Sequence, residues 1–352
     1  MLAPLEIRVP PVGYGGTEMI VSILTEELVR RGHDVTLFAS GDSITKAKLI
    51  SVTLEYLRKN ETKSAALPLL NAVTCLEFSD RFEIIHNHAG IFGMLTAGFS
   101  KTPMLTTFHG QMEEETSVAF NHYNGWYNTV SKSARRYIPP KPKFAGVVYN
   151  AIDCAAYPFN RGARGDYLLY LSRFCADKGA HLAIKAARKL GLPLVLAGDI
   201  HPSEVDYFRA QVKPFIDGKM IKYEGQVDND RKKELMMNAK CLLAPITWPE
   251  PFGLFMVEAQ ACGSPVVSLA YGAAPEIVRH GETGYVVDSY EEMVQSIGEV
   301  DRIDSRKCRQ FVLDSFDVPV LADNYLKAYN RVLTQSSTAA PELVVKKKAG
   351  LA

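Results

Sequence analysis

The segment PEPFGLFMVE, residues 249–258, places two carboxylates, Glu250 and Glu258, at a predicted junction between a loop and a helix. Its two prolines keep the approach to the helix extended. The mostly apolar run over residues 253–262 predicts the helix, which Gly263 can close as a C-terminal cap. Glu250 is therefore expected in the loop and Glu258 in the second helical turn.

The position of Glu258 on this helix suggests what it could bind. Residues four apart share a helix face, so Glu258 is expected on the side of Leu254, close to the helix start. The free N–H groups and the positive dipole end at that start attract anions. A polyol and a phosphate could be held there together. The alternative is a solvent-facing glutamate on a surface helix, which a helix that is apolar almost all round disfavours.

Two cations follow a predicted strand in the same half of the sequence. Arg173 comes directly after the strand-like residues 167–172, and Lys178 with Gly179 opens a predicted helix near residues 181–190. Ligands of open α/β sheets lie at the carboxyl ends of strands. Two cations beside a helix N-terminus predict a diphosphate site there, although each cation alone could be an ordinary surface charge.

Two further features lie in the first half of the sequence. The glycine-rich loop PPVGYGGT, residues 10–17, precedes a predicted helix and could approach a phosphate or sugar through its backbone. It lacks the Gly-x-Gly-x-x-Gly spacing of dinucleotide sites, and the sequence has no Walker Gly-Lys-Thr. His109 follows the strand-like residues 104–108, which predicts either a cleft-facing imidazole or a partly buried structural histidine.

Histidines and cysteines also raise the question of a metal. His86 and His88 follow another predicted strand, but a His-x-His pair without a third ligand is more typical of packing or hydrogen bonding. The six cysteines are scattered, with no close pair of the kind that binds zinc. The sequence therefore predicts no metal site, and its cysteines indicate a reduced, cytoplasmic protein.

Length and composition are those of an ordinary globular protein. With 352 residues, 47% apolar and 22% charged, the chain is long enough for two cores. Its formal net charge of +1 gives no global indication of nucleic acid or of a strongly anionic surface as partner. No secretory h-region opens the sequence, and no run reaches the roughly 18 apolar residues of a membrane span. Any membrane contact is expected to be peripheral.

Alternating strand-like and helical segments predict two parallel sheets with helices on both faces. Apolar residues at helical spacing predict an opening helix over residues 17–31, capped by Thr17, and an amphipathic last helix over 319–333. The expected strands of the first half are 34–39, 82–86, 104–108, 126–130 and 146–149. Those of the second half are 167–172, 194–197, 221–223, 241–244, 266–269 and 285–287, with helices near 181–190, 230–238 and 253–262.

The fold class that follows is α/β, with two doubly wound Rossmann-like domains and an active site in the cleft between them. Residues 153–166, rich in Gly, Pro and Arg, are the expected linker. The expected units are a first domain at 1–152, a second at 153–317, a helix returning to the first domain at 318–334 and a disordered tail at 335–352.

Several spaced motifs, taken in order, resemble those of retaining family 4 glycosyltransferases (glycosyltransferase group 1) of the GT-B fold. The resemblance runs from about residue 10 to residue 333, and it depends on the order of the motifs because each one alone is unspecific. The motifs are PPVGYGGTE from residue 10, FHG at 108–110, VSKSARR at 130–136, NAID at 150–153, SRFCADKG at 172–179, YEGQVD at 223–228 and the Glu-x7-Glu segment.

The resemblance implies a role for each matching residue. Glu258 resembles the residue that holds the ribose hydroxyls of a nucleoside diphosphate sugar, and Glu250 the one beside the donor sugar. Arg173 and Lys178 resemble the pair that neutralises the diphosphate. His109 resembles the residue close to the hydroxyls of the transferred sugar. The other donor-site positions are Gly15 and Gly16 in the glycine-rich loop, Gln226 and Val227 where the base is read, and Phe252, Gly253 and Leu254 at the helix start.

The implied activity is transfer of a sugar from a nucleoside diphosphate donor, with UDP as the expected nucleotide, to a hydroxyl. Breaking the glycosyl-phosphate bond builds negative charge on the leaving diphosphate, which two fixed cations and a helix dipole stabilise most in the transition state. No metal and no permanently bound cofactor are then required. Retention could have the departing phosphate accept the acceptor's proton on the same face, or could use Glu250 as a covalent nucleophile.

Some features leave alternatives open. Only MLAPLEIRV precedes the glycine-rich loop, so either the chain begins late or Leu2 and Ala3 supply the remnant of a first strand. Residues 111–125 show no pattern, and because this half of the cleft binds the acceptor in such enzymes, the acceptor is not predicted. A nucleotide-sugar epimerase of the same architecture, which needs acid-base residues, and a nucleotide-sugar binding protein without turnover are the other functions considered.

A cluster of basic residues raises the question of a membrane partner. It could rest against anionic lipid as a weak peripheral contact, or it could be a solvated basic face. Its members are Lys132, Arg135, Arg136, Lys141 and Lys143.

Overall fold

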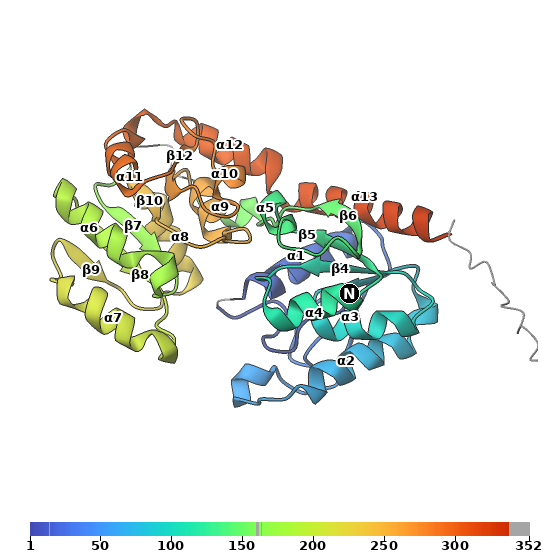
Figure 1. Ribbon diagram of the computed structural model, residues 1–352. Coiled ribbons are helices and arrows are strands. Elements are labelled where there is room, and N and C mark those ends of the chain that lie inside the picture. Colours follow the sequence, from blue (N-terminus) through green and yellow to red (C-terminus); the bar gives the residue numbers. More distant parts are fainter. Residues whose placement is uncertain (14, 160–161, 163, 338–352) are drawn as a thin grey trace, which may run out of the picture.

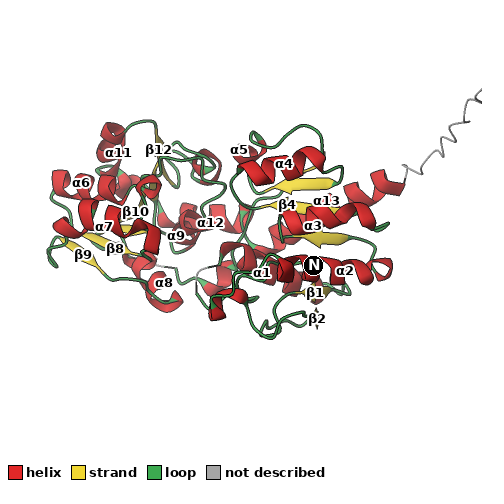
Figure 2. Ribbon diagram, turned by 60° about the horizontal axis from the view of Figure 1, so that its bottom comes forward, coloured by secondary structure: helices red, strands yellow, loops and turns green. Residues whose placement is uncertain are grey.

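The computed structural model describes residues 1–13, 15–159, 162 and 164–337. Within them the strands pair in parallel and form an amino-terminal and a carboxyl-terminal sheet, each layered between helices (Figures 1 and 2). The fold is therefore the predicted α/β arrangement of two Rossmann-like sheets. No helix of the described residues combines the length and the apolar character needed to cross a bilayer.

The carboxyl-terminal sheet determines where a ligand would bind. Its strands are β7 (Leu168–Leu171), β8 (Leu194–Ala197), β9 (Ile221–Tyr223), β10 (Cys241–Ala244), β11 (Val266–Leu269) and β12 (Gly284–Val287). They lie in the order β12-β11-β10-β7-β8-β9. The strand order therefore reverses between β7 and β10, and open α/β sheets bind ligands at the carboxyl ends of the strands at such a reversal. The helices are α6 (Ala180–Leu190), α7 (Val205–Gln211), α8 (Asn229–Asn238), α9 (Leu254–Ala261), α10 (Ala274–Ile277), α11 (Tyr290–Ile297) and α12 (Ser305–Ser315).

The amino-terminal sheet follows the same plan. Strand β1 (Thr36–Phe38) pairs with β2 (Lys48–Ile50), and β3 (Ile85–Asn87), β4 (Met104–Phe108), β5 (Trp126–Thr129) and β6 (Lys143–Val147) lie side by side in that order. Its helices are α1 (Gly16–Arg30), α2 (Ala66–Glu77), α3 (Ile91–Thr96), α4 (Glu114–His122) and α5 (Lys132–Arg135).

The first residues of the chain join the two parts of this sheet. Leu2 bridges to both β1 and β3, and its N–H donates to the carbonyl of His86 at 2.8 Å. Ala3 N–H donates to the carbonyl of Phe38 at 2.9 Å, and both apolar side chains are fully buried. Leu2 and Ala3 thus lie in the place of a short first strand between β1 and β3.

Several expected elements have the predicted bounds and others do not. Strands β4, β8, β9, β10 and β11 begin and end where they were predicted. The expected cap by Thr17 is wrong, because α1 begins at Gly16 and no side chain caps it. Strand β6 begins at Lys143 rather than at residue 146. Strand β2 and helices α2, α3, α4, α7, α10, α11 and α12 were not predicted, and α4 occupies much of the segment in which no pattern was found.

The last helix, α13 (Val318–Ser337), runs back along the amino-terminal half (Figure 1). Its buried residues Leu321, Ala322 and Tyr325 share one apolar cluster with Ile20 and Leu24 of α1. The helix thus closes one face of the amino-terminal sheet. The tail predicted at 335–352 begins inside α13, and from residue 338 on it lies outside the described residues.

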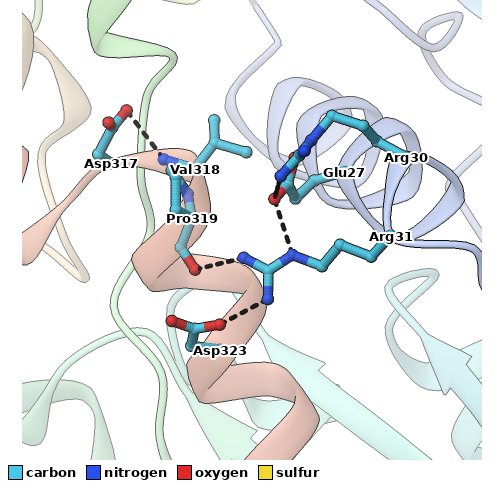
Figure 3. Close-up of polar contacts among 7 residues, drawn as sticks. All are labelled: Glu27, Arg30, Arg31, Asp317, Val318, Pro319 and Asp323. Atoms are coloured by element: carbon cyan, nitrogen blue, oxygen red, sulfur yellow. Dashed lines mark hydrogen bonds and ion pairs between the residues drawn. The ribbon is translucent and has the colours of Figure 1, made fainter.

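Polar contacts fix the start of α13 on the end of α1, as Figure 3 shows. Arg31 donates to the carbonyl of Pro319 at 3.0 Å and to Asp323 Oδ1 at 2.5 Å. Glu27 accepts hydrogen bonds from Arg30 and Arg31, which hold its pKa down to about 2. The network aligns the Arg31 guanidinium for its contacts with α13.

The chain crosses between the two halves twice, and the two crossing segments are joined by hydrogen bonds. Ile152 N–H donates to the carbonyl of Phe316 at 2.9 Å. Asp317 Oδ1 accepts from Cys154 N–H and from Val318 N–H, each at 3.0 Å. One carboxylate therefore ties the outgoing passage to the first residue of α13, where the chain returns.

Candidate active site

Lys178 and Glu250 meet at the carboxyl ends of β7 and β10. The Lys178 ammonium donates to Glu250 Oε2 as a close ion pair. Lys178 is only 8% exposed, and its Nζ lies 4.8 Å from the centroid of the Trp248 ring. Because a buried charge is costly unless it is paired, the carboxylate and the aromatic face together stabilise this cation. The structure thus brings together two residues that the sequence predicted for one site.

Gly179 allows the turn that carries Lys178 to lie close to the loop that leads to Glu250. Gly179 has a φ of 74°, and a Cβ there would lie 2.0 Å from the carbonyl oxygen of Pro245. Thr247 N–H donates to the carbonyl of Asp177 at 2.9 Å across the same contact. The turn that carries Lys178 can therefore lie directly against the loop that leads to Glu250.

Arg173 is the second predicted cation and has a different environment. It is exposed at the end of β7, where its carbonyl accepts a hydrogen bond from Tyr170 at 2.9 Å. Among the described residues, its guanidinium has neither a hydrogen bond nor an ion pair. The backbone is held, and the positive group is left available to a ligand.

The side chain of Glu258, on α9, is mostly buried. Its Oε1 accepts from Lys232 Nζ at 2.7 Å and from the Tyr157 hydroxyl at 2.6 Å, and the side chain is 12% exposed. Burial, and secondly the Glu258 charge, raise the pKa of Tyr157. The solvent-facing alternative for Glu258 is therefore wrong. Gly253 precedes the helix with a φ of 91° and Gly263 ends it with a φ of 88°, the latter as predicted.

Lys232 and Tyr157 were not among the predicted site residues. Lys232 lies in the helix that was predicted at 230–238, and Tyr157 lies in the predicted linker. Neither position carried a local signal, because each becomes a partner of Glu258 only when α8 and the linker fold beside α9.

The two halves of the molecule meet at the starts of α1 and α9. A Cβ on Gly16 would lie 3.6 Å from Leu254 Cδ1, and a Cβ on Gly15 would lie 2.7 Å from the Pro11 side chain. A larger residue at Gly15 would therefore force the loop to shift. Gly15, Gly16 and Leu254, which the sequence placed in different parts of one donor site, are thus close in space.

A small cavity lies between the halves and has a volume of about 160 Å³. Its walls include the neighbours of His109 in the chain on one side and the neighbours of Glu250 on the other. The lining residues are Phe108, Gly110, Gln111, Met112, Ala134, Tyr137, Pro249 and Pro251. The cavity therefore joins the region of His109 to that of Glu250.

His109 is partly buried at the end of β4, and its Nε2 lies 2.8 Å from His88 Nδ1. Burial lowers the pKa of His109 to about 4, so the imidazole is neutral near pH 7. His86 and His88 also bond to other side chains, as expected for histidines that pack rather than bind metal. Among the described residues, no three His, Cys, Asp or Glu side chains converge as metal ligands would.

The remaining predicted positions differ in their exposure. The Phe252 side chain is buried in the core, with its ring 5.7 Å from that of Phe316, so it packs rather than faces a ligand. Gln226 is exposed and Val227 is partly buried at the turn between β9 and α8. In the basic cluster, Arg135 lies over the Phe144 ring at 4.9 Å.

Glu18, which follows the glycine-rich loop, is a buried carboxylate whose charge affects the stability of the fold. It lies in the first turn of α1 and is 6% exposed, and burial raises its pKa from 4.5 to about 7. Between these pH values the unfolded chain has released a proton that the folded chain keeps. The free energy of unfolding therefore falls as pH rises from 4.5 to 7.

Glu18→Gln is expected to be about as stable as the parent at pH 4 and more stable at pH 8. The difference at pH 8 should be about 3 kcal/mol at 1.36 kcal/mol per pKa unit. Differential scanning calorimetry at both pH values measures it, with the exposed Glu83→Gln as control. A difference that does not change with pH would contradict this account.

Comparison with known proteins shows the family to which the chain is related. Residues 14–156 match the model of "Glycosyltransferase Family 4", and residues 159–309 match that of "Glycosyl transferases group 1". A putative glycosyltransferase of Bacillus subtilis (strain 168) is 23% identical over 338 residues, which cover 84% of this chain and 81% of that protein.

Solved structures share the fold over almost the whole chain. A glycosyltransferase involved in avilamycin A biosynthesis is 24% identical, with a TM-score of 0.71 and coverage of 95% of this chain and 97% of that one. An Anabaena protein, HepE, solved in complex with UDP, is 20% identical, with a TM-score of 0.71 and coverage of 94% and 98%. The two family models lie end to end over most of the sequence, and the chain belongs to the family 4 (group 1) glycosyltransferases of the GT-B fold.

Proposed function

We propose that this glycosyltransferase moves a sugar from a UDP-linked donor to a hydroxyl acceptor, with retention of configuration at the anomeric carbon. The UDP assignment is supported by the likeness to HepE, which was solved with UDP and also with UDP-glucose. The acceptor stays open because α4 and the loop before it supply no recognisable binding pattern.

One observation carries the proposal: two cations of different character lie on the single turn that follows β7. Lys178 is buried and held by Glu250, whereas Arg173 is exposed without a partner among the described residues. The eleven residues of α6 begin directly after this turn, so their free N–H groups add to the positive field. A leaving diphosphate is the ligand that such a turn, at the reversal of strand order, would stabilise.

The proposed reaction keeps its charges and protons balanced. The bond between the anomeric carbon and the β-phosphate oxygen breaks, and Arg173 and Lys178 stabilise the negative charge that develops on the diphosphate. The acceptor oxygen bonds to the anomeric carbon on the same face. Its proton passes to an oxygen of the departing phosphate, so no enzyme group needs to change its protonation state.

The environment of Glu250 favours this route over a covalent intermediate. Its Oε2 is engaged by the Lys178 ammonium, and a paired carboxylate is a weaker nucleophile than a free one. In this route Glu250 positions the Lys178 ammonium for its contact with the diphosphate, and its carboxylate lies beside the donor sugar. Glu258 is assigned to the ribose, since Lys232 and Tyr157 fix its carboxylate.

The test is incubation of the protein with UDP-glucose, UDP-galactose, UDP-N-acetylglucosamine and GDP-mannose, followed by chromatography of the nucleotides. Slow release of free UDP from at least one donor is expected. An isomerised but intact donor would instead indicate an epimerase, and binding without change would indicate a protein that lacks turnover. With an acceptor from cell extract, proton NMR of the product determines whether the anomeric configuration is retained.

A further inference from the structure

One carboxylate of the carboxyl-terminal half binds polar groups of the amino-terminal half. Glu276 Oε2 accepts hydrogen bonds from Lys132 N–H at 2.8 Å and from the Tyr149 hydroxyl at 2.9 Å. Its Oε1 accepts from Ser133 N–H at 2.7 Å. Glu276 lies in the short helix α10, whereas its partners lie at the start of α5 and just after β6. Three hydrogen bonds from one side chain therefore join the two halves.

These bonds satisfy groups that the amino-terminal half leaves without partners of its own. The first N–H groups of a helix have no acceptor within that helix. In α5, Ala134 N–H donates to the Ser131 hydroxyl at 3.0 Å, and Glu276 is the acceptor for the two N–H groups that precede it. Burial, and secondly the bond to Glu276, raise the pKa of Tyr149, so its hydroxyl keeps its proton and donates. The start of α5 is thus held by a residue of the other half.

The residues just before α10 contact the backbone of Glu250. Ala273 N–H donates to the carbonyl of Glu250 at 2.9 Å. Gly272 has a φ of 58°, and a Cβ there would lie 2.3 Å from both the backbone nitrogen and the carbonyl oxygen of Glu250. Only glycine therefore lets this segment lie so close to the Glu250 loop. Glu276 follows directly in α10, so one short segment both contacts Glu250 and reaches the other half.

Both ends of this connection lie at the cavity between the halves. Ala134 and Tyr137, in α5 and just after it, form part of the amino-terminal wall of the cavity. Pro249 and Pro251, on either side of Glu250, form part of the opposite wall. The carboxylate on α10 therefore connects the two walls: it is bonded to the start of the helix in one wall, and its own segment is bonded to the loop in the other.

We propose that Glu276 is a positioning residue for sugar transfer, because it fixes the amino-terminal wall of the cavity relative to the ion pair of Lys178 and Glu250. The inference rests on the proposed function for the reaction that takes place at this cavity. The side chains assigned to the nucleotide, Arg173, Lys178 and Glu258, all belong to the carboxyl-terminal half. Loss of the Glu276 contacts should therefore slow the reaction and leave nucleotide binding intact.

Hydrogen exchange measured by mass spectrometry tests the connection without any substrate. In Glu276→Ala we expect faster exchange at residues 131–137, which lose their acceptor, and also at residues 248–254, against which the segment before α10 packs. The control is Arg31→Ala, which likewise removes three hydrogen bonds, at the junction of α1 and α13, and should leave both peptides unchanged. Unchanged exchange at residues 248–254 in Glu276→Ala would overturn the link to Glu250.

Kinetics then distinguish a positioning role from a general loss of structure. Glu276→Ala should lower kcat for release of UDP from the active nucleotide sugar by about tenfold to 100-fold, the scale on which a small misplacement of reacting groups acts. The dissociation constant for UDP, measured by isothermal titration, should equal that of the parent, and Arg31→Ala should retain the parent kcat. Parent kcat in a folded Glu276→Ala protein, or a UDP affinity that falls together with kcat, would overturn the positioning role.

Milder substitutions decide the question if the alanine variant does not fold. Tyr149→Phe removes one bond and keeps the ring against Phe252 and Phe316, whose centroids lie 6.2 and 5.7 Å away. Glu276→Gln keeps one acceptor oxygen but turns its NH₂ group toward a donor. We expect kcat to fall from parent to Tyr149→Phe and further in Glu276→Gln, at unchanged UDP affinity.

Parent rates in both milder variants would overturn the role of the carboxylate. Absence of UDP release from every donor would refute the proposed function, and the exchange experiment would then decide the link between the two walls alone.

Discussion

Arg173→Ala is expected to reduce kcat about 100-fold or more while leaving the temperature of unfolding unchanged. The loss follows from the scale of electrostatic stabilisation that one well-placed donor provides in a transition state. The unchanged stability follows from the structure, since Arg173 is exposed and its guanidinium makes no hydrogen bond or ion pair among the described residues.

Lys178→Ala is the companion variant and should lose activity on the same scale. It also removes the partner of Glu250 and the cation above Trp248, so its stability should fall as well. The control for both is Lys189→Ala, an exposed cation on the far part of α6. Steady-state kinetics together with thermal unfolding measure the effects. Parent rates in the double variant lacking Arg173 and Lys178 would defeat the diphosphate assignment.

Glu258→Gln is expected to raise the KM for the donor at least tenfold with a smaller change in kcat. The amide keeps the shape and can still accept from Tyr157, but it loses the charge that pairs with Lys232. Hydrogen bonds to a charged group contribute about 1.5–3 kcal/mol, which corresponds to a factor of ten or more. Because the ribose is remote from the broken bond, this binding is the same in the ground and transition states.

The control for this variant is Glu234→Gln, which also removes a carboxylate from an ion pair in α8 but lies on the surface, 55% exposed. Its donor KM should equal that of the parent. Isothermal titration with UDP adds a measurement that does not depend on turnover. A Glu258→Gln protein that binds UDP as tightly as the parent would place the ribose elsewhere.

Segments whose pattern lies in neighbouring residues could be predicted well. Strands β8, β10 and β11 are short apolar runs between polar turns, and they have the expected bounds. The glycine-proline sequence after α9 ended that helix as predicted. The short helices α3 and α10 were missed, because four to six residues show no helical period of their own.

The candidate site likewise contains residues that could be predicted from the sequence and residues that could not. Glu250, Lys178 and Arg173 could be chosen in advance because each follows a strand-like run or opens a helix, and parallel sheets bring such residues to one edge. Phe252 was assigned to the donor site from its place in the motif, whereas its ring packs in the core. Which side chains of a motif face inward depends on the elements that cover it.

The sequence by itself determined the α/β class, the order of the motifs and the charged residues at the strand ends, since these depend on local periodicity and turn chemistry. Only the tertiary structure decided that Lys232 and Tyr157 hold Glu258, that Leu2 lies between β1 and β3 and that Tyr329 of α13 bonds to His86. These contacts join residues far apart in the chain. They form because sheet order and helix packing bring the residues together, and the pattern of neighbouring residues in the sequence does not predict such contacts.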